Sequence, residues 1–159
     1  VPALEIPLDA PPGKAPKLEK GWGHVSFSHC CDALLIAWSP RAIGVDIERG
    51  DRAFKAHQVS KRYFSEEDNK LLDGLEGDKL RSAVLKEWVK KEAAIKWQGG
   101  RLSRDLRKWY FGNQSDLAIH KISGYKVGFD SFYYNDWYLA VVFNNKIHSN
   151  PLIICNESI

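Results

Sequence analysis

Hydrophobic and polar positions alternate in the first third of the chain as they do in β-strands. In residues 24–28 and 42–48, every second side chain is apolar, which predicts strands with one face toward a core. Residues 33–38 are continuously apolar, which predicts a strand buried on both faces. We therefore expect this part of the chain to contribute strands.

Helical signals follow these strands. Residues 52–62 are compatible with a helix, and Ser65 and Asp68 have the spacing of a capping box that opens a short helix towards Leu75. Asp78 is expected to cap a long helix that ends at Gly99-Gly100, because glycine commonly terminates helices. The expected core-facing residues of this helix are Val84, Leu85, Trp88, Val89 and Ile95.

Beyond Leu106 the pattern returns to strands. A meander is predicted over residues 117–122, 125–134 and 137–143, with turns at Ser123-Gly124 and Asn135-Asp136. Residues 151–155 can add a last edge strand. Strands, then helices, then strands indicate an α+β fold, in which an antiparallel or mixed sheet packs on the long helix.

Composition narrows the function classes. The 159 residues are 44% hydrophobic and 27% charged, and this length suits one domain with a core. A net charge of +3 is too small for a dedicated nucleic-acid binder, but it is compatible with phosphate-bearing or acidic partners. Three cysteines without paired spacing indicate free thiols, and no apolar run approaches a membrane span. These features predict a cytoplasmic protein.

The start of the chain is unusual. It begins with Val1-Pro2, the sequence has no methionine, and five of the first twenty residues are proline. We expect residues 1–20 to form an extended connector, with a further segment upstream.

Two acidic side chains share one face of the strand over residues 42–48. Asp46 and Glu48 lie two positions apart, so their carboxylates point the same way. Mg²⁺ prefers carboxylate oxygens together with water and substrate phosphate, so the pair is a candidate half-site for this ion. A solvated strand end leading into Arg49 and Arg52 explains the same spacing, and spacing alone leaves both interpretations open.

Glu92 interrupts an apolar stripe of the long helix. Its neighbours in the stripe are Leu85, Trp88 and Ile95. A carboxylate there is costly unless a cation or hydrogen bonds compensate it, and Lys96 lies one helical turn further on. Glu92 either forms a simple ion pair at the rim, or completes a metal site with Asp46 and Glu48, or stands beside that site as a general base.

Ser28-His29 lie at the end of a predicted strand. An isolated histidine is most often a packed or surface residue. In a site that handles phosphate, a protonated His29 and the Ser28 hydroxyl are suitable donors to the phosphate oxygens, and Lys14 and Arg41 can add positive charge.

Together these motifs resemble the surfactin-synthetase-activating class of the 4′-phosphopantetheinyl transferase superfamily. That class carries, in order, Gly-Lys-Pro, Ser-His-Ser, (Ile/Val)-Gly-(Ile/Val)-Asp-x-Glu, Arg-(Phe/Tyr)-Phe-Ser and Trp-x-x-Lys-Glu-(Ala/Ser)-x-x-Lys. The matching residues are Gly13-Lys14, Ser28-His29, Ile43-Gly44-Val45-Asp46-Ile47-Glu48, Arg62-Tyr63-Phe64-Ser65 and Trp88 through Lys96. Order and spacing agree from about residue 13 to residue 100.

The resemblance implies transfer of the 4′-phosphopantetheine arm of coenzyme A to a serine of an acyl or peptidyl carrier protein. It implies Mg²⁺, with Mn²⁺ as a substitute, held by Asp46, Glu48 and Glu92. The implied catalytic residues are Glu92, as a direct or water-mediated base, and Lys96. The implied ligands of the coenzyme A phosphates are Lys14, Ser28, His29 and Lys96.

The resemblance also implies two pseudo-symmetric halves with the active site between them. Residues 1–40 would be a connector and the end of the first half, and residues 41–159 the second half. With a first half upstream the enzyme would be a monomer. The chain departs from the family pattern at Ala15 in place of proline, Cys30 in place of the second serine, and Asp68 in place of glutamate.

Two other functions remain open at this point. A metal-dependent nuclease also uses Asp, Glu and Lys, although the helical spacing of Glu92 and Lys96 counts against the strand-borne motif of that class. The other alternative is a carrier-protein-binding fragment without catalysis.

Overall fold

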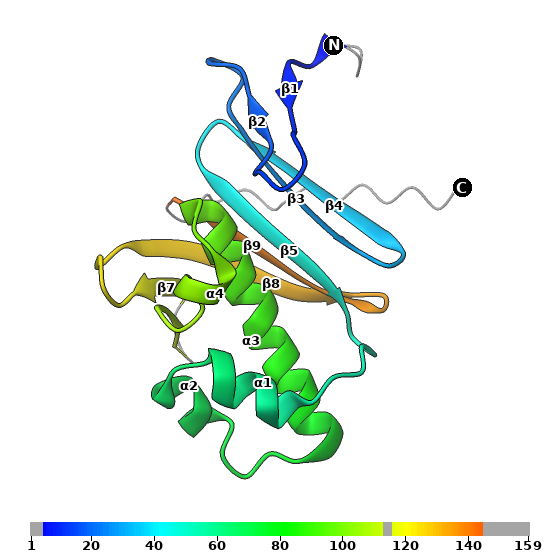
Figure 1. Ribbon diagram of the computed structural model, residues 1–159, viewed down its shortest axis with the longest axis vertical. Helices are drawn as coiled ribbons and strands as arrows, with labels where there is room; N and C mark the ends of the chain where they lie inside the picture. The colour runs from blue at the N-terminus through cyan, green and yellow to red at the C-terminus, as the bar shows by residue number, and fades with distance from the viewer. Residues whose placement is uncertain (1–4, 113–115, 145–159) are drawn as a thin grey trace.

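The structure is a computed structural model that describes residues 5–112 and 116–144. Two small hairpins precede the main body (Figure 1). They are formed by β1 (Leu8–Asp9) with β2 (Lys17–Leu18), and by β3 (His24–Cys30) with β4 (Ala33–Ser39). The first hairpin corrects the prediction of an extended connector, because two short strands pair within residues 8–18.

A five-stranded antiparallel sheet forms the main body, in the order β5-β9-β8-β7-β6. Its strands are β5 (Ile43–Arg49), β6 (Trp109–Phe111), β7 (Leu117–His120), β8 (Lys126–Tyr134) and β9 (Trp137–Phe143). The meander is confirmed, and its turns contain Gly124 at φ 71° and Asn135 at φ 47°. The three-residue strand β6 was not predicted, since it is too short to show a period. The predicted strand at residues 151–155 lies outside the described residues.

Four helices connect β5 to β6: α1 (Ala56–Tyr63), α2 (Glu66–Leu71), α3 (Gly77–Gln98) and α4 (Leu102–Asp105). The Ser65–Asp68 capping box is confirmed at the start of α2. Glu76 rather than Asp78 occupies the N-cap position of α3, so that prediction was wrong by two residues. Gly99 ends α3 in the left-handed conformation, as expected. The one-turn helix α4 was not predicted.

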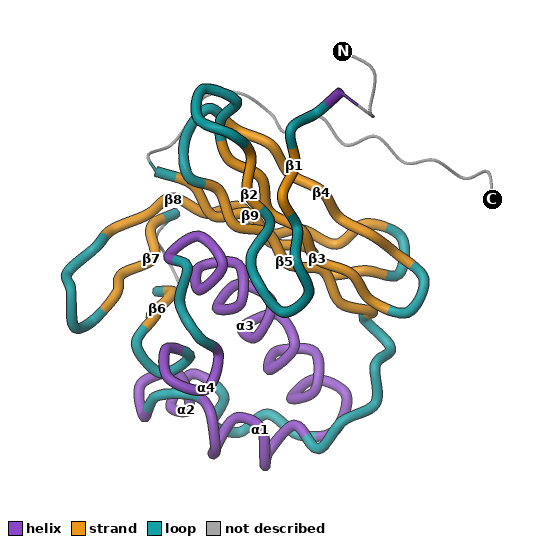
Figure 2. Tube along the Cα trace, turned by 45° about the horizontal axis from the view of Figure 1, so that its top comes forward, coloured by secondary structure: helices purple, strands orange, loops and turns teal. Residues whose placement is uncertain are grey.

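The core lies between α3 and the sheet, and the helices gather on one side of the strands (Figure 2). Buried side chains of α3 pack on those of the strands, and Trp109 and Phe111 close the far edge. A smaller cluster joins α1 and α2 to the start of α3. The predicted α+β fold, with a sheet packed on the long helix, is confirmed. Of the helices that the structure describes, none is long and apolar enough to cross a membrane.

Strand β4 differs from its prediction. Leu34, Ile36 and Trp38 are 62%, 56% and 63% exposed, so the expected burial on both faces was wrong. A strand turns alternate side chains to opposite faces, and here only the face toward β5 is covered by described residues. Cys30 and Cys31 are free thiols, as expected.

Candidate active site

Strand β5 presents its polar face to α3. Gly44 lies directly beneath the backbone of α3, where even a Cβ atom would come within 2.9 Å of the Trp97 Cα. This close approach, which only glycine permits, brings the neighbouring Asp46 under the same helix. The side chain of Asp46 is only 3% exposed. The sequence pattern therefore predicted the correct face for Asp46, but not how deeply it is buried.

Asp46 accepts two strong hydrogen bonds on one oxygen. The Ser28 hydroxyl donates to Oδ1 at 2.6 Å, and the Lys96 ammonium donates to the same atom at 2.7 Å. Oδ2 is buried and has no hydrogen-bond partner among the described residues. Burial raises the pKa of Asp46, while the charge of Lys96 opposes that rise. Glu92, which lies next to this buried carboxylate, also lowers the pKa of Asp46.

Ser28 connects the β3–β4 hairpin to this site. Besides donating to Asp46, its hydroxyl oxygen accepts from the Ile47 backbone N–H at 3.3 Å, and Ser26 Oγ accepts in the same way from Val45 N–H at 3.1 Å. These serines pair with donors along β5 and hold β3 beside it. Sequence reasoning assigned Ser28 to phosphate, and its bond to Asp46 was not foreseen.

Glu92 is a residue of α3, and its side chain lies beside Asp46 of β5. Burial raises its pKa to about 8, and the negative charge of Asp46 adds to this rise, while Lys96 opposes it. The ion pair of Lys96 is made with Asp46, and not with Glu92 as the helical spacing indicated. A carboxyl group with this pKa is a much stronger base, once ionised, than an exposed glutamate.

Glu48 shares the face of Asp46 but turns towards another cation. Its carboxylate forms an ion pair with Arg52, and burial raises its pKa against the effect of that arginine. Each of the two interpretations of the Asp46–Glu48 spacing therefore describes one of the two residues. Asp46 is buried in the cluster, whereas Glu48 forms the ion pair expected of a strand end.

The side chains around Asp46 offer carboxylate oxygens, the ligands that hard divalent cations prefer. Across residues 5–112 and 116–144, no three acidic, cysteine or histidine side chains are grouped as a preformed metal centre. The unpartnered Asp46 Oδ2 and the mutual repulsion of the Asp46 and Glu92 carboxylates nevertheless suit a hard cation with oxygen ligands. The residues present fit such an ion, with Lys96 and Arg52 now supplying the positive charge.

The remaining predicted phosphate ligands lie at the surface. Lys14 is exposed in the loop between β1 and β2, and His29 is exposed on β3 next to the buried Ser28. In the described part of the chain, neither makes a hydrogen bond or ion pair with Asp46, Glu92 or Lys96. The structure thus brings together Ser28, Asp46, Glu92 and Lys96, and leaves Lys14 and His29 outside this group.

A second buried ion pair was missed by sequence reasoning. The Lys91 side chain is 0% exposed, and its ammonium donates to Asp68 at 2.8 Å and to the Trp109 carbonyl. Apolar residues at i+3 and i+4, Ala94 and Ile95, are the sequence signal that would have placed Lys91 inside. The pair links α3 to α2 and β6, and so supports the helix that carries Glu92 and Lys96.

Comparisons with known proteins support one family. Residues 42–142 match the family model of the 4′-phosphopantetheinyl transferase superfamily. No curated protein sequence matches the chain.

Two solved structures are similar in fold. A holo-(acyl-carrier-protein) synthase from Bacillus anthracis, solved in complex with CoA (3′,5′-ADP), is 21% identical with a TM-score of 0.54, and the match covers 64% of this chain and 92% of that one. The synthase of Thermotoga maritima is 16% identical with a TM-score of 0.50, and the match covers 66% of this chain and 64% of that one. At this identity the structures show the fold, and the family model shows the family. The chain belongs to the 4′-phosphopantetheinyl transferase superfamily.

Proposed function

We propose that the protein transfers the 4′-phosphopantetheine arm of coenzyme A to a serine of a carrier protein, in a reaction that depends on Mg²⁺. The observation that carries this proposal is the buried Asp46, bonded to Ser28 and Lys96 and lying beside Glu92 with its raised pKa. In this cluster Asp46 can bind a metal ion, Lys96 can bind phosphate, and Glu92 can act as a base. Family membership supports the same reaction class.

The cation would be held by Asp46, Glu48 and Glu92. When bound, Mg²⁺ would neutralise negative charge on the diphosphate of coenzyme A. The support in the structure is the free Oδ2 of Asp46 and the two neighbouring acidic groups. Glu48 would have to leave Arg52 in order to contribute.

Glu92 would act as the base. The carrier serine hydroxyl loses its proton, directly or through water, to the Glu92 carboxylate as its oxygen attacks the phosphorus that bears the pantetheine arm. The P–O bond to adenosine 3′,5′-bisphosphate breaks, and that group leaves with the electron pair. The pKa of about 8 makes ionised Glu92 a competent proton acceptor near neutral pH.

The positive and hydroxyl groups would bind phosphate. Lys96 can exchange its bond to Asp46 for the diphosphate, and Ser28 can do the same with its hydroxyl proton. His29, which follows Ser28 on β3, and the exposed Lys14 would reach the nucleotide phosphates. Charge neutralisation and in-line positioning are the main requirements of this chemistry.

The proposal extends to the subtype of the enzyme, its carrier protein and its oligomeric state. The two-half, surfactin-synthetase-activating subtype rests on the order of the sequence motifs, with residues 1–40 ending one half and residues 41–159 forming the other. The carrier would be an acyl or peptidyl carrier protein of fatty-acid, polyketide or peptide synthesis in the cytoplasm, and the enzyme would be a monomer.

The test is incubation of the full-length protein with coenzyme A, Mg²⁺ and several apo carrier proteins, followed by mass spectrometry. The expected result is a carrier heavier by one phosphopantetheine arm. Glu92→Gln should remove transfer while leaving the fold intact, and Glu66→Gln, an exposed control on α2, should leave transfer unchanged. Carrier binding without any mass shift, or nicking of plasmid DNA instead, would contradict the proposal.

A further inference from the structure

The segment that follows β5 carries an arginine that reaches back to the candidate site. Arg52 forms an ion pair with Glu48, and among the described residues it is the only cation that does so. The Glu48 side chain is 18% exposed, whereas the Arg52 side chain is 49% exposed. The carboxylate is therefore largely covered, and its guanidinium partner lies in contact with solvent.

The backbone that carries Arg52 is held on two sides. The Gly50 N–H donates to the Asp136 carbonyl at 2.7 Å, which ties the segment to the β8–β9 turn. The Arg81 guanidinium of α3 donates to the carbonyls of Gly50 and Arg52, at 2.6 Å and 3.3 Å. Because these bonds fix the backbone on both sides, Arg52 can change partners by rotation of its side chain alone.

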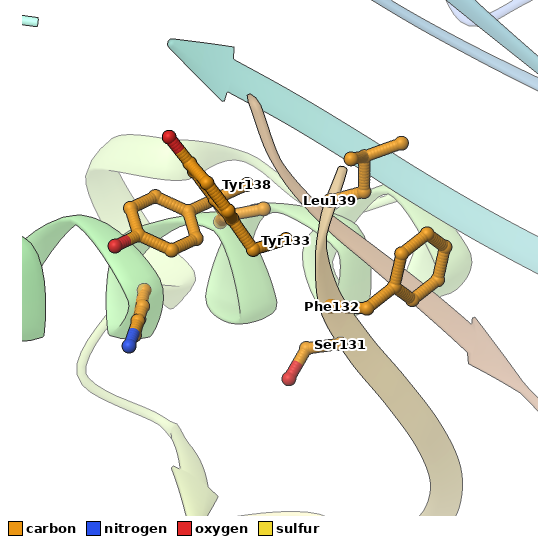
Figure 3. Close-up of a pocket in the computed structure, with 7 residues that line it drawn as sticks. Ser131, Phe132, Tyr133, Tyr138 and Leu139 are labelled. Atoms are coloured by element: carbon orange, nitrogen blue, oxygen red, sulfur yellow. The ribbon is translucent and has the colours of Figure 1, made fainter. Parts of the chain in front are cut away.

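The backbone around Glu48 is fixed as well. Glu48 pairs across the sheet with Tyr138, whose hydroxyl hydrogen-bonds Ser82 Oγ at 2.8 Å. Tyr133 and Tyr138 line a cavity next to α3, and their ring centroids lie 4.8 Å apart (Figure 3). The Tyr133 ring packs so closely on Gly50 that a Cβ atom there would come within 3.0 Å of it. The Arg52 side chain is therefore the part of this ion pair that can leave.

Arg52 and a divalent cation compete for the same carboxylate. Lone pairs that accept from a guanidinium are directed at its N–H groups, and two positive charges on one carboxylate repel each other. Arg52 must leave Glu48 before that carboxylate can hold a cation. A phosphate group is a suitable new partner, because a guanidinium fork matches its oxygens as well as it matches a carboxylate.

We propose that Arg52 is a further phosphate-binding residue, which holds Glu48 in the free protein and exchanges it for the diphosphate of coenzyme A. This inference rests on the proposed function for the identity of the cation and of the diphosphate. Its consequence is a coupling between the two ligands. A phosphate that takes Arg52 frees Glu48 for the cation, so each ligand strengthens the binding of the other by the same factor.

The first measurement is the affinity of the free protein for Mn²⁺, followed by electron paramagnetic resonance without coenzyme A. Arg52→Gln should raise this affinity about fivefold, which is the scale of a partly exposed ion pair. Lys55→Gln is the matched control, because it removes the same charge from a nearby exposed side chain that forms no ion pair with a described residue. In a Glu48→Gln background, Arg52→Gln should have no effect.

The second measurement repeats the Mn²⁺ titrations with coenzyme A present. Coenzyme A should tighten Mn²⁺ binding to the wild type and to Lys55→Gln more than to Arg52→Gln, because the variant lacks the guanidinium that the diphosphate would remove from Glu48. The inference is overturned if Arg52→Gln binds Mn²⁺ no better than the wild type, if its effect persists in the Glu48→Gln background, or if coenzyme A acts equally on both proteins. Neither measurement involves transfer, so a protein that shows this coupling without modifying a carrier would contradict the proposed function alone.

Discussion

Gly44→Ala isolates the contact that places the candidate site under α3. The added Cβ would lie less than 3.0 Å from three backbone atoms of the helix: the Ala93 carbonyl oxygen and the nitrogen and Cα of Trp97. Real Cβ contacts essentially never come this close, and backbone atoms cannot rotate away as a side chain can. Strand and helix must therefore separate locally.

The cost can be estimated from two contributions. Overpacking by one carbon in a core that can adjust costs about 1–3 kcal/mol, and a clash with backbone on both sides belongs at or above the upper end. Separation also stretches the 2.7 Å bond between Lys96 and Asp46, which leaves Asp46 less compensated in its buried position. We expect Gly44→Ala to lower the free energy of unfolding by at least about 3 kcal/mol.

The assay is urea unfolding followed by tryptophan fluorescence, with the slope of the transition checked for a change in the native state. Gly112→Ala is the matched control, because a Cβ there would meet its nearest neighbour, the Tyr110 ring, at an ordinary 3.6 Å. A Gly44→Ala variant that unfolds within about 1 kcal/mol of the wild type, and no earlier than the control, would show that the packing of α3 on β5 has been misjudged.

Three other results are expected. Lys91→Met should cost about 3–5 kcal/mol in urea unfolding because it leaves Asp68 charged and buried, and adding Asp68→Asn should recover part of this; an additive double variant would contradict the pairing. Burial lowers the pKa of His120, and the charge of Lys108 lowers it further while Asp105 opposes this, so the contribution of His120 to stability should fall as pH drops below about 6.5. The raised pKa of Glu92 acts in the opposite direction in both proteins, so the measurement is the difference in unfolding free energy between the wild type and His120→Asn; a difference that does not change with pH would contradict the prediction. Mg²⁺ should bind more tightly with coenzyme A present than alone in calorimetry, and equal affinities would count against a shared site.

Much of the fold follows from sequence periods. The alternation in residues 42–48 predicted which face of β5 carries Asp46, and the capping box of Ser65 and Asp68 and the terminal Gly99 marked helix boundaries that the structure confirms. These features depend on residues that are close together in the sequence, so they can be predicted from the sequence alone. The strand β6 and the helix α4 were not predicted, because three or four residues are too few to show a period of hydrophobic positions.

The structure brings together Ser28, Asp46, Glu92 and Lys96 from the predicted set, but the bonds between them did not follow from the sequence. The helical spacing paired Lys96 with Glu92, whereas tertiary packing turns it to Asp46 on another element. The exposure of Leu34, Ile36 and Trp38 could not be predicted either. The sequence of a continuously apolar strand does not show whether one face or both faces of the strand are covered. Contacts between elements depend on how the elements pack, which periodicity does not encode.

The charges of the site explain how three acidic groups can share it before any ligand binds. Asp46, Glu48 and Glu92 face two cations, Lys96 and Arg52, and the raised pKa of Glu92 allows it to hold a proton. The free site is therefore close to neutral, which is the condition for tolerating buried carboxylates. A divalent cation alone would leave an excess of positive charge, whereas a cation together with a diphosphate would not. In the proposed reaction the electrostatics would favour binding of the cation together with the diphosphate, and Lys96 would then exchange Asp46 for the diphosphate.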